Sequence, residues 1–324
     1  MMNKIIQAGP DSKFNYLSWA AILFVAAVIV PLVLGQYPPY YIRLASSILI
    51  FLLYGISFNL LYGFTGFLSF GQAAYFGTGA YVSALIIRAT DSLFLALLGG
   101  AVFPALLSVV LGYFCVKRSK LYFAMLTLAF AQLIYTIAFR WRDVTRGDDG
   151  LIVPRIQYLS DPYHFYYFIL AIVAVCVLIH WVIVHSSFGH TLKAICQSQD
   201  RVSFIGVPVE KQVHAAFIIS AFFGGLAGAI YAPYIGIVSP ALTHWEYSLI
   251  PVIMVVFGGP KYFWGPAIGA IVYMVLKDVV TLYTGYWMIV FGLLLMVIIL
   301  VTPNGVMGLL EQGVKKFKAR FASK

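Results

Sequence analysis

Charged residues are scarce in this sequence of 324 residues. Only 10% of them are Asp, Glu, Lys or Arg, whereas a soluble globular protein has about a quarter. Hydrophobic residues make up 62% of the chain, and the mean hydropathy is +0.93. This composition excludes a soluble globular domain and predicts a polytopic membrane protein.

Cysteine and the usual catalytic motifs are also scarce or missing. Cys115, Cys176 and Cys196 form no C-x-x-C pair, so neither a disulfide framework nor a zinc site is predicted. The sequence has no G-x-x-x-x-G-K-[ST] phosphate loop, no H-E-x-x-H and no G-x-S-x-G. We therefore expect no enzyme activity, no cofactor and no metal in this chain, so that any ATP is bound by partner subunits.

Titratable side chains are almost absent from the apolar runs. A proton-coupled carrier usually needs such groups in the middle of the membrane. Either a partner therefore supplies the energy for transport, or transport is passive.

Apolar runs of about twenty residues follow one another along the chain. This length crosses a hydrocarbon layer about 30 Å thick at about 1.5 Å per helical residue. The runs do not alternate as the strands of a barrel would, so the predicted fold class is an all-α polytopic membrane protein with a single transmembrane domain over residues 1–324 and about ten helices. The expected spans are Leu17–Leu34, Arg43–Tyr62, Gln72–Ile87, Leu93–Val116, Leu121–Phe139, His164–His185, Val213–Pro233, the short Tyr247–Phe257, Tyr262–Val280 and Tyr286–Val301.

The basic residues indicate the orientation. The net charge is +10, and with a cytoplasmic N-terminus most of the 21 Lys and Arg residues lie inside, as the positive-inside rule requires. We therefore expect the charge to face anionic lipid and not nucleic acid. The predicted topology places both termini in the cytoplasm and the protein in the inner membrane, with residues 1–16, 186–211 and the basic tail 311–324 cytoplasmic and residues 140–162 external.

Two glycine-rich interruptions predict broken helices. The first lies within Leu61–Gln72 and the second within Val255–Ala270, and their similar places hint at an internal inverted repeat. A broken helix is tolerated at membrane depth where protein or a water-filled cavity satisfies its backbone, although the first could equally be an ordinary inside loop with tight turns. The hinge or packing glycines expected here are Gly63, Gly66, Gly71, Gly77, Gly79, Gly258, Gly259 and Gly265; the uncharged polar residues expected to line a substrate path are Asn59, Thr65, Ser69 and Gln72.

Three other polar groups have a structural and a functional interpretation. Thr127 and Gln132 are expected to form hydrogen bonds between helices. Lys277 and Asp278 are expected to be an interfacial pair and not a proton relay. Asp148 and Asp149 lie between glycines in the external loop; their spacing does not match a calcium loop, so a docking surface or a hydrogen-bonded turn is favoured.

The polar stretch 186–211 is the longest interruption of the apolar pattern. Its apolar residues Leu192, Ile195, Val202 and Ile205 recur at intervals of three or seven, which indicates a short amphipathic helix on the membrane surface. An ordinary solvated loop is the alternative.

Several segments in this order make the chain resemble the permease subunits of branched-chain amino-acid ABC transporters, the Liv-type family, and its LivM-like branch in particular. They are Gly66–Tyr81, Leu121–Phe130, Gly147–Leu151, Gly258–Gly259 with Gly265–Pro266, and Pro303–Gly305. The resemblance implies import driven by two cytoplasmic ATPase subunits, a second related permease in a heterodimer, and an external substrate-binding protein, for which Asp148 and Asp149 are the candidate docking residues.

In that family the central cytoplasmic loop docks on the ATPase. The pattern falls here on Gly189, Lys193, Ala194, Ile195, Ile205 and Gly206. The sequence departs from it at Cys196, where a basic residue is usual, and at Gln197 and Gln199, where acids are frequent. A stand-alone channel or facilitator for a small neutral solute such as urea remains the alternative function, and the exact solute stays open.

Overall fold

The computed structural model describes residues 38–117, 119–154, 161–283, 285–286, 289–294 and 305–309, together with residues 28, 31 and 296. The expected tails 1–16 and 311–324 lie outside the described residues, as do residues 155–160 of the external loop, most of the span Leu17–Leu34 and half of the span Tyr286–Val301.

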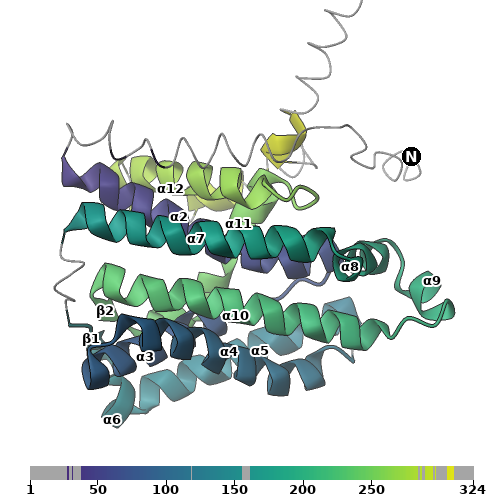
Figure 1. Ribbon diagram of the computed structural model, residues 1–324, viewed down its shortest axis with the longest axis horizontal. Helices are drawn as coiled ribbons and strands as arrows, with labels where there is room; N and C mark the ends of the chain where they lie inside the picture. The colour runs from purple at the N-terminus through teal and green to yellow at the C-terminus, as the bar shows by residue number, and fades with distance from the viewer. Residues whose placement is uncertain are drawn as a thin grey trace, which may run out of the picture.

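The described chain is a bundle of long helices with short elements at its two ends (Figure 1). In chain order the elements are α2 (Pro39–Thr65), α3 (Gln72–Thr90), α4 (Leu93–Cys115), α5 (Lys120–Arg140), α6 (Arg142–Thr145), η2 (Gly147–Asp149), β1 (Leu151–Ile152), α7 (Pro162–His185), α8 (Ser187–Gln197), α9 (Gln199–Phe204), α10 (Val209–Ile235), β2 (Ile237–Val238), η4 (Pro240–Thr243), η5 (Trp245–Ser248), α11 (Leu249–Gly258) and α12 (Gly265–Tyr283).

Among the described residues, six helices are long and apolar enough to cross a membrane: α2, α4, α5, α7, α10 and α12. The chain is thus an all-α polytopic membrane protein, but the count of ten spans is not confirmed. The expected span Tyr247–Phe257 contains only the ten-residue α11, which at about 1.5 Å per residue is about 15 Å long. That length is half of what one crossing helix requires.

Local sequence signals set several helix ends. Pro39 occupies the first turn of α2, where a missing N–H does no harm. Gly66 ends the same helix in the left-handed region, at φ 74°, and its N–H donates to the Tyr62 carbonyl. The side chain of Asp161 accepts from the Tyr163 N–H at the start of α7.

Helices α2 and α10 form the interior of the bundle. In their most apolar stretches 78% and 67% of residues are buried, against 33% in α4, α5 and α7. Helix α10 packs against α2, α3 and α4, while α7 and α12 pack against α2. The outer face of α4 exposes large apolar side chains such as Phe94 and Leu106, as expected of a surface in contact with lipid or with another membrane subunit.

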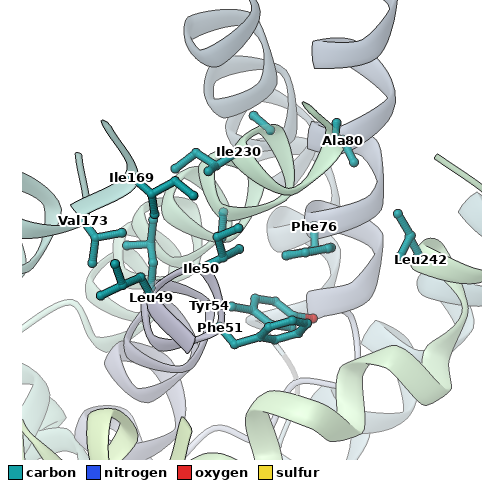
Figure 2. Close-up of a cluster of buried hydrophobic side chains, with 14 of the residues drawn as sticks. Leu49, Ile50, Phe51, Tyr54, Phe76, Ala80, Ile169, Val173, Ile230 and Leu242 are labelled. Atoms are coloured by element: carbon teal, nitrogen blue, oxygen red, sulfur yellow. The ribbon is translucent and has the colours of Figure 1, made fainter. Parts of the chain in front are cut away.

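The core combines aliphatic and aromatic layers (Figure 2). Ile50 of α2 lies among the aliphatic side chains, which include Ile169 of α7 and Ile230 of α10. On the other side of α2, the Tyr54 ring lies 4.7 Å from the Phe76 ring. This aromatic layer therefore joins α2 to α3.

Small residues bring helix backbones together, as the sequence predicts. A Cβ atom added to Gly228 of α10 would lie 1.9 Å from the Phe76 carbonyl oxygen of α3, and one added to Gly79 would lie 2.2 Å from the Gly225 oxygen. Close approach of this kind strengthens dispersion contacts between membrane helices, where the hydrophobic effect contributes little.

The bundle has two distinct ends, which we name by their elements. The β1 end carries α6, η2 and the antiparallel pair β1–β2, in which Leu151 faces Val238 and Ile152 faces Ile237. The α8 end carries α8 and α9 (Figure 1). The described residues of the expected external segment 140–162 thus lie at one end, and the expected cytoplasmic segment 186–211 lies at the other, apart from residues 209–211, which begin α10.

Candidate functional site

Two segments without α-helix meet inside the bundle, and we call their meeting place the junction. The first break, residues 66–71, connects α2 to α3, and the second break, residues 239–248, contains η4 and η5 and leads into α11. The Ser248 hydroxyl donates to the Phe70 carbonyl at 2.7 Å and accepts from the Ala73 N–H at 2.8 Å. One fully buried serine therefore satisfies backbone groups of both the first break and α3.

Other hydroxyl groups hold the junction from neighbouring helices. Thr127 of α5 accepts from the Phe70 N–H at 3.1 Å, so it bonds the first break and not another helix as expected. The other expected partner, Gln132, has an exposed side chain on α5. On the α10 side, Gln72 Nε2 donates to the Ser220 hydroxyl at 2.9 Å, and Ser220 donates to the Ser57 carbonyl at 2.6 Å.

The four residues expected to line a path are all buried, with 0–1% of their surface exposed. Ser69 and Gln72 lie at the junction, and Ser69 accepts from the Gly71 N–H at 3.2 Å. Asn59 and Thr65 lie toward the α8 end: Asn59 Nδ2 donates to the Tyr262 carbonyl at 3.4 Å, and Thr65 donates to the Leu61 carbonyl. The four side chains form no single open site in this structure.

One cavity approaches the junction from each end. At the β1 end, a cavity of about 370 Å³ borders the second break at Glu246 and Tyr247. At the α8 end, a cavity of about 240 Å³ borders the first break at Phe67. Between them lie buried side chains of the junction, including Ser248 and Gln72.

The predicted glycines lie at close contacts between backbone segments. A Cβ on Gly71 of the first break would lie 3.2 Å from the Thr127 oxygen, and one on Gly63 of α2 would lie 2.3 Å from the Pro260 oxygen. At the turn that joins α11 to α12, a Cβ on Gly258 would lie 1.7 Å from the oxygen of Gly265. Gly259 in this turn has φ 107°, which an L side chain rarely adopts. These glycines permit the packing; their function as hinges stays a prediction.

The segment 186–211 forms two helices and not one. Helix α8 begins with Ser186, whose hydroxyl accepts from the Gly189 N–H at 3.4 Å, and a second cap at Ser198 begins α9. Leu192, Ile195 and Val202 are buried, as the amphipathic pattern predicts, but Ile205 is 78% exposed. The single-helix interpretation is therefore wrong: Ser198 is extended, at φ −162°, and interrupts the periodicity.

Helix α8 is firmly attached to the bundle. A Cβ on Gly189 would lie 2.3 Å from the Val184 oxygen, so only glycine fits the tight corner between α7 and α8. Lys193 Nζ donates to the same carbonyl at 3.3 Å and lies 5.5 Å from the Phe64 ring centroid. Burial lowers the pKa of the Lys193 ammonium below its ordinary value. Lys193 therefore faces the bundle, whereas the neighbouring Ala194 is exposed.

The tip of this segment is apolar and uncovered. Phe204 is 88% exposed and Ile205 78% exposed, and Gly206 follows at φ 87° with no atom within 4 Å of an added Cβ. The tip projects from the α8 end beyond the long helices (Figure 1). We call Phe204 and Ile205 the apolar tip. Sequence reasoning named Ile205 but missed Phe204, although a Phe next to Ile in a polar stretch is a visible signal.

Asp148 and Asp149 are both exposed at the β1 end, and they differ in position. Asp148 borders the 370 Å³ cavity, and Asp149 does not. Lys277 borders the same cavity, while its neighbour Asp278 accepts a hydrogen bond of 2.6 Å from the Tyr40 hydroxyl. The cavity thus gathers charged residues that are distant in sequence.

Comparison with known proteins agrees with this architecture. The sequence matches the family described as "Branched-chain amino acid transport system / permease component" over residues 40–300. The high-affinity branched-chain amino acid transport system permease protein LivM of Escherichia coli K12 is 22% identical over 303 residues, which cover 85% of this chain and 71% of that protein. No solved structure matches significantly.

Two further relatives show the same level of similarity. The probable branched-chain amino acid transport permease protein LivM of Methanocaldococcus jannaschii is 22% identical, covering 77% of this chain and 88% of its own. The permease protein LivH of the high-affinity branched-chain amino acid transport system of Salmonella typhimurium is 22% identical over 282 residues, covering 79% of this chain and 90% of its own.

Proposed function

The chain belongs to the family of branched-chain amino acid transport system permease components, and on this premise we propose that it is the membrane-spanning subunit of an ABC importer for branched-chain or related amino acids. The family consists of transport permeases and not of enzymes. In our proposal, ATP is hydrolysed by two separate cytoplasmic subunits, since this sequence has no phosphate loop.

The proposed assembly contains further partners. A second, related permease would pair with this chain, and an external binding protein would deliver the amino acid at the β1 end. There, the exposed Asp148 and Asp149 are candidates for docking. The proposed location is the inner membrane, with the α8 end and both termini in the cytoplasm, which the distribution of basic residues favours.

The apolar tip is the observation that carries the proposal. Phe204 and Ile205 adjoin at the end of α9 and are both largely exposed, and α9 lies outside the long helices at the end proposed to be cytoplasmic (Figure 1). Large exposed apolar side chains in a polar surrounding are typical of protein interfaces. A stand-alone channel has no use for such a contact, whereas a permease driven by a separate ATPase requires one.

Helix α8 connects the apolar tip to the translocation elements. It packs against the last turns of α2, where Lys193 lies over Phe64 and Cys196 Sγ lies 4.0 Å from the Gly63 carbonyl oxygen. The first break starts immediately after α2, at Gly66. A displacement of the tip by the ATPases would therefore act on the end of α2 and, through the first break, on the junction.

Within this mechanism the junction is the closed part of the path. Ser69 and Gln72 remain our candidates for contact with the passing solute, because both lie in or next to the first break. Asn59 and Thr65 would contact it later, toward the α8 end. The hinge function belongs to Gly66, which takes a positive φ where α2 ends, and to Gly259, which does so where α11 ends.

The test is co-purification of this chain with ATPase subunits encoded beside its gene. We expect a variant with both Phe204→Asp and Ile205→Asp to lose the ATPases, since a charge in an apolar interface is strongly unfavourable. Ile152→Asp is the matched control: Ile152 is 64% exposed at the β1 end, and this variant should retain them.

The function itself is measured as uptake of radiolabelled leucine into proteoliposomes that contain the assembled transporter. Uptake should require ATP and the binding protein, and should be lost in the doubly substituted tip variant. ATP-independent passage of leucine or urea through the purified chain alone would instead establish the facilitator. Retention of the ATPases by the tip variant would show that the docking surface lies elsewhere.

A further inference from the structure

The cavity at the β1 end has a mixed-charge lining. Asp148 of η2 and Glu246 of η5 contribute carboxylates, and Lys277 of α12 contributes an ammonium group. His244 Nδ1 lies 3.6 Å from Glu246 Oε2, and its ring centroid lies 4.8 Å from that of Tyr135. The imidazole thus fixes the Glu246 carboxylate against the wall formed by α5.

The same cavity also has an apolar wall. Tyr135 of α5, Tyr247 of η5 and Ile250 of α11 border it, and its volume of about 370 Å³ falls in the range of small-molecule sites, about 300–1,000 Å³. A site with groups of both charges and an apolar wall matches a small zwitterion that carries an apolar side chain. An anion would meet the two carboxylates, and a neutral solute would use none of the charges.

The cavity lies next to the junction, on its β1 side. Tyr247 borders the cavity, and the next residue, Ser248, binds the first break and α3. The Tyr247 ring lies 5.3 Å from the Phe76 ring and 6.3 Å from the Phe51 ring. Tyr247 therefore closes the floor of the cavity toward the aromatic layer of the core.

We propose that this cavity is the site at which the permease itself receives its solute, a small zwitterion with an apolar side chain. Glu246 and Asp148 face the ammonium group, Lys277 faces the carboxylate, and Tyr247 separates the bound solute from the junction. The assignment rests on the proposed function, because it takes an amino acid as the cargo. It adds a recognition site in the permease to recognition by the binding protein.

The test uses the assembled transporter in nanodiscs and a membrane-impermeant maleimide. Ala241 is an exposed residue that borders the cavity, so Ala241→Cys provides the reporter. Asp149→Cys provides the matched control, since Asp149 is exposed at the same end but does not border the cavity. Leucine at ten times its Kd should slow labelling of the Ala241→Cys variant about tenfold and leave the control unchanged.

Chemical specificity separates recognition from simple blocking of the cavity. Leucinamide, which lacks the carboxylate, and 4-methylpentanoate, which lacks the amine, should protect Ala241→Cys much less than leucine does. Adding Lys277→Met or Glu246→Gln should also abolish protection by leucine. In uptake assays, Asp148→Asn should raise the KM for leucine, whereas Asp143→Asn, which changes an exposed carboxylate of α6 that does not border the cavity, should not. Equal effects of the two variants would show that the general charge of the β1 end sets the KM and would overturn the place of Asp148 in the site.

The outcomes distinguish this assignment from the proposed function. ATP-dependent leucine uptake without protection of Ala241→Cys overturns the cavity assignment and leaves the importer standing. Protection by leucine in a preparation that never shows ATP-dependent uptake overturns the importer and leaves the cavity as an amino-acid site. Equal protection by leucine, leucinamide and 4-methylpentanoate overturns the assignment of the charged residues.

Discussion

Ser248→Ala should destabilise the protein only by removing hydrogen bonds at the junction. The substitution removes one hydroxyl group and adds no volume, so its effect comes from two lost hydrogen bonds. The Phe70 carbonyl loses its donor, and the Ala73 N–H loses its acceptor. Both groups lie in or next to a non-helical segment at membrane depth, where no lipid group can replace the serine.

The magnitude follows from these two bonds. A buried polar group left unpaired costs about 1–3 kcal/mol, while hydrogen bonds between membrane helices average about 0.6 kcal/mol. We therefore expect a loss of about 1–4 kcal/mol, with about 2 kcal/mol as the central value. At about 2–4 °C per kcal/mol, the midpoint of thermal unfolding should fall by roughly 4–8 °C.

The control is Ser46→Ala. Ser46 is also buried, but its hydroxyl donates at 2.9 Å to the Ile42 carbonyl of its own helix. That carbonyl also accepts a backbone N–H within α2, so it stays paired when the Ser46 hydroxyl is removed. The midpoint of Ser46→Ala should therefore lie within about 1 °C of the wild-type midpoint. The comparison thus isolates the long-range connection from the loss of a serine.

The assay can use the protein's own thiols. Cys115 and Cys176 are buried, whereas Cys196 is partly exposed, so a fluorogenic thiol reagent reports unfolding in a Cys196→Ser background. Equal midpoints for Ser248→Ala and Ser46→Ala would refute the reasoning, because they would mean that water or other groups satisfy the first break. If the midpoints of both variants fell below that of the wild type, the loss would be one of general packing.

The first break was predictable because its signal is local, whereas the second break, residues 239–248, was not predicted. Glycine and uncharged polar residues between Leu61 and Gln72 weaken a helix wherever they occur. Their partner was not predictable: Ser248 is 178 residues from Phe70, and a lone serine gives no sign of what it binds. Hydrogen bonds of this kind depend on tertiary packing, which periodicity does not contain.

Segment 186–211 shows the same limit of sequence-based prediction over a shorter distance along the chain. The spacing of Leu192, Ile195 and Ile205 predicts one face only if the helix is continuous. The chain instead begins a second helix after Ser198, so Ile205 does not share a buried face with Leu192 and Ile195 and is exposed. Ser198 is a typical N-cap residue, so this correction was available from the sequence, whereas the exposure of Phe204 was not.

Two further substitutions test the interior of the bundle by thermal unfolding. Gly228→Ala places a Cβ atom 1.9 Å from the Phe76 carbonyl oxygen, so α3 and α10 must separate, and we expect a loss of about 1–3 kcal/mol or more. Gly285→Ala, whose added Cβ has no atom of the described residues within 4 Å, should be neutral. His180 is buried, its Nε2 has no hydrogen-bond partner among the described residues, and its ring lies 4.0 Å from Phe223. His180→Phe should therefore be neutral or stabilising by up to about 1 kcal/mol, since removal of the unpaired Nε2 offsets loss of the 3.0 Å contact between Nδ1 and the Cys176 carbonyl of the same helix. A lower midpoint for His180→Phe would show that Nε2 makes a polar contact in the assembled protein, and uptake measured on the same variant would show whether that contact serves transport or stability alone.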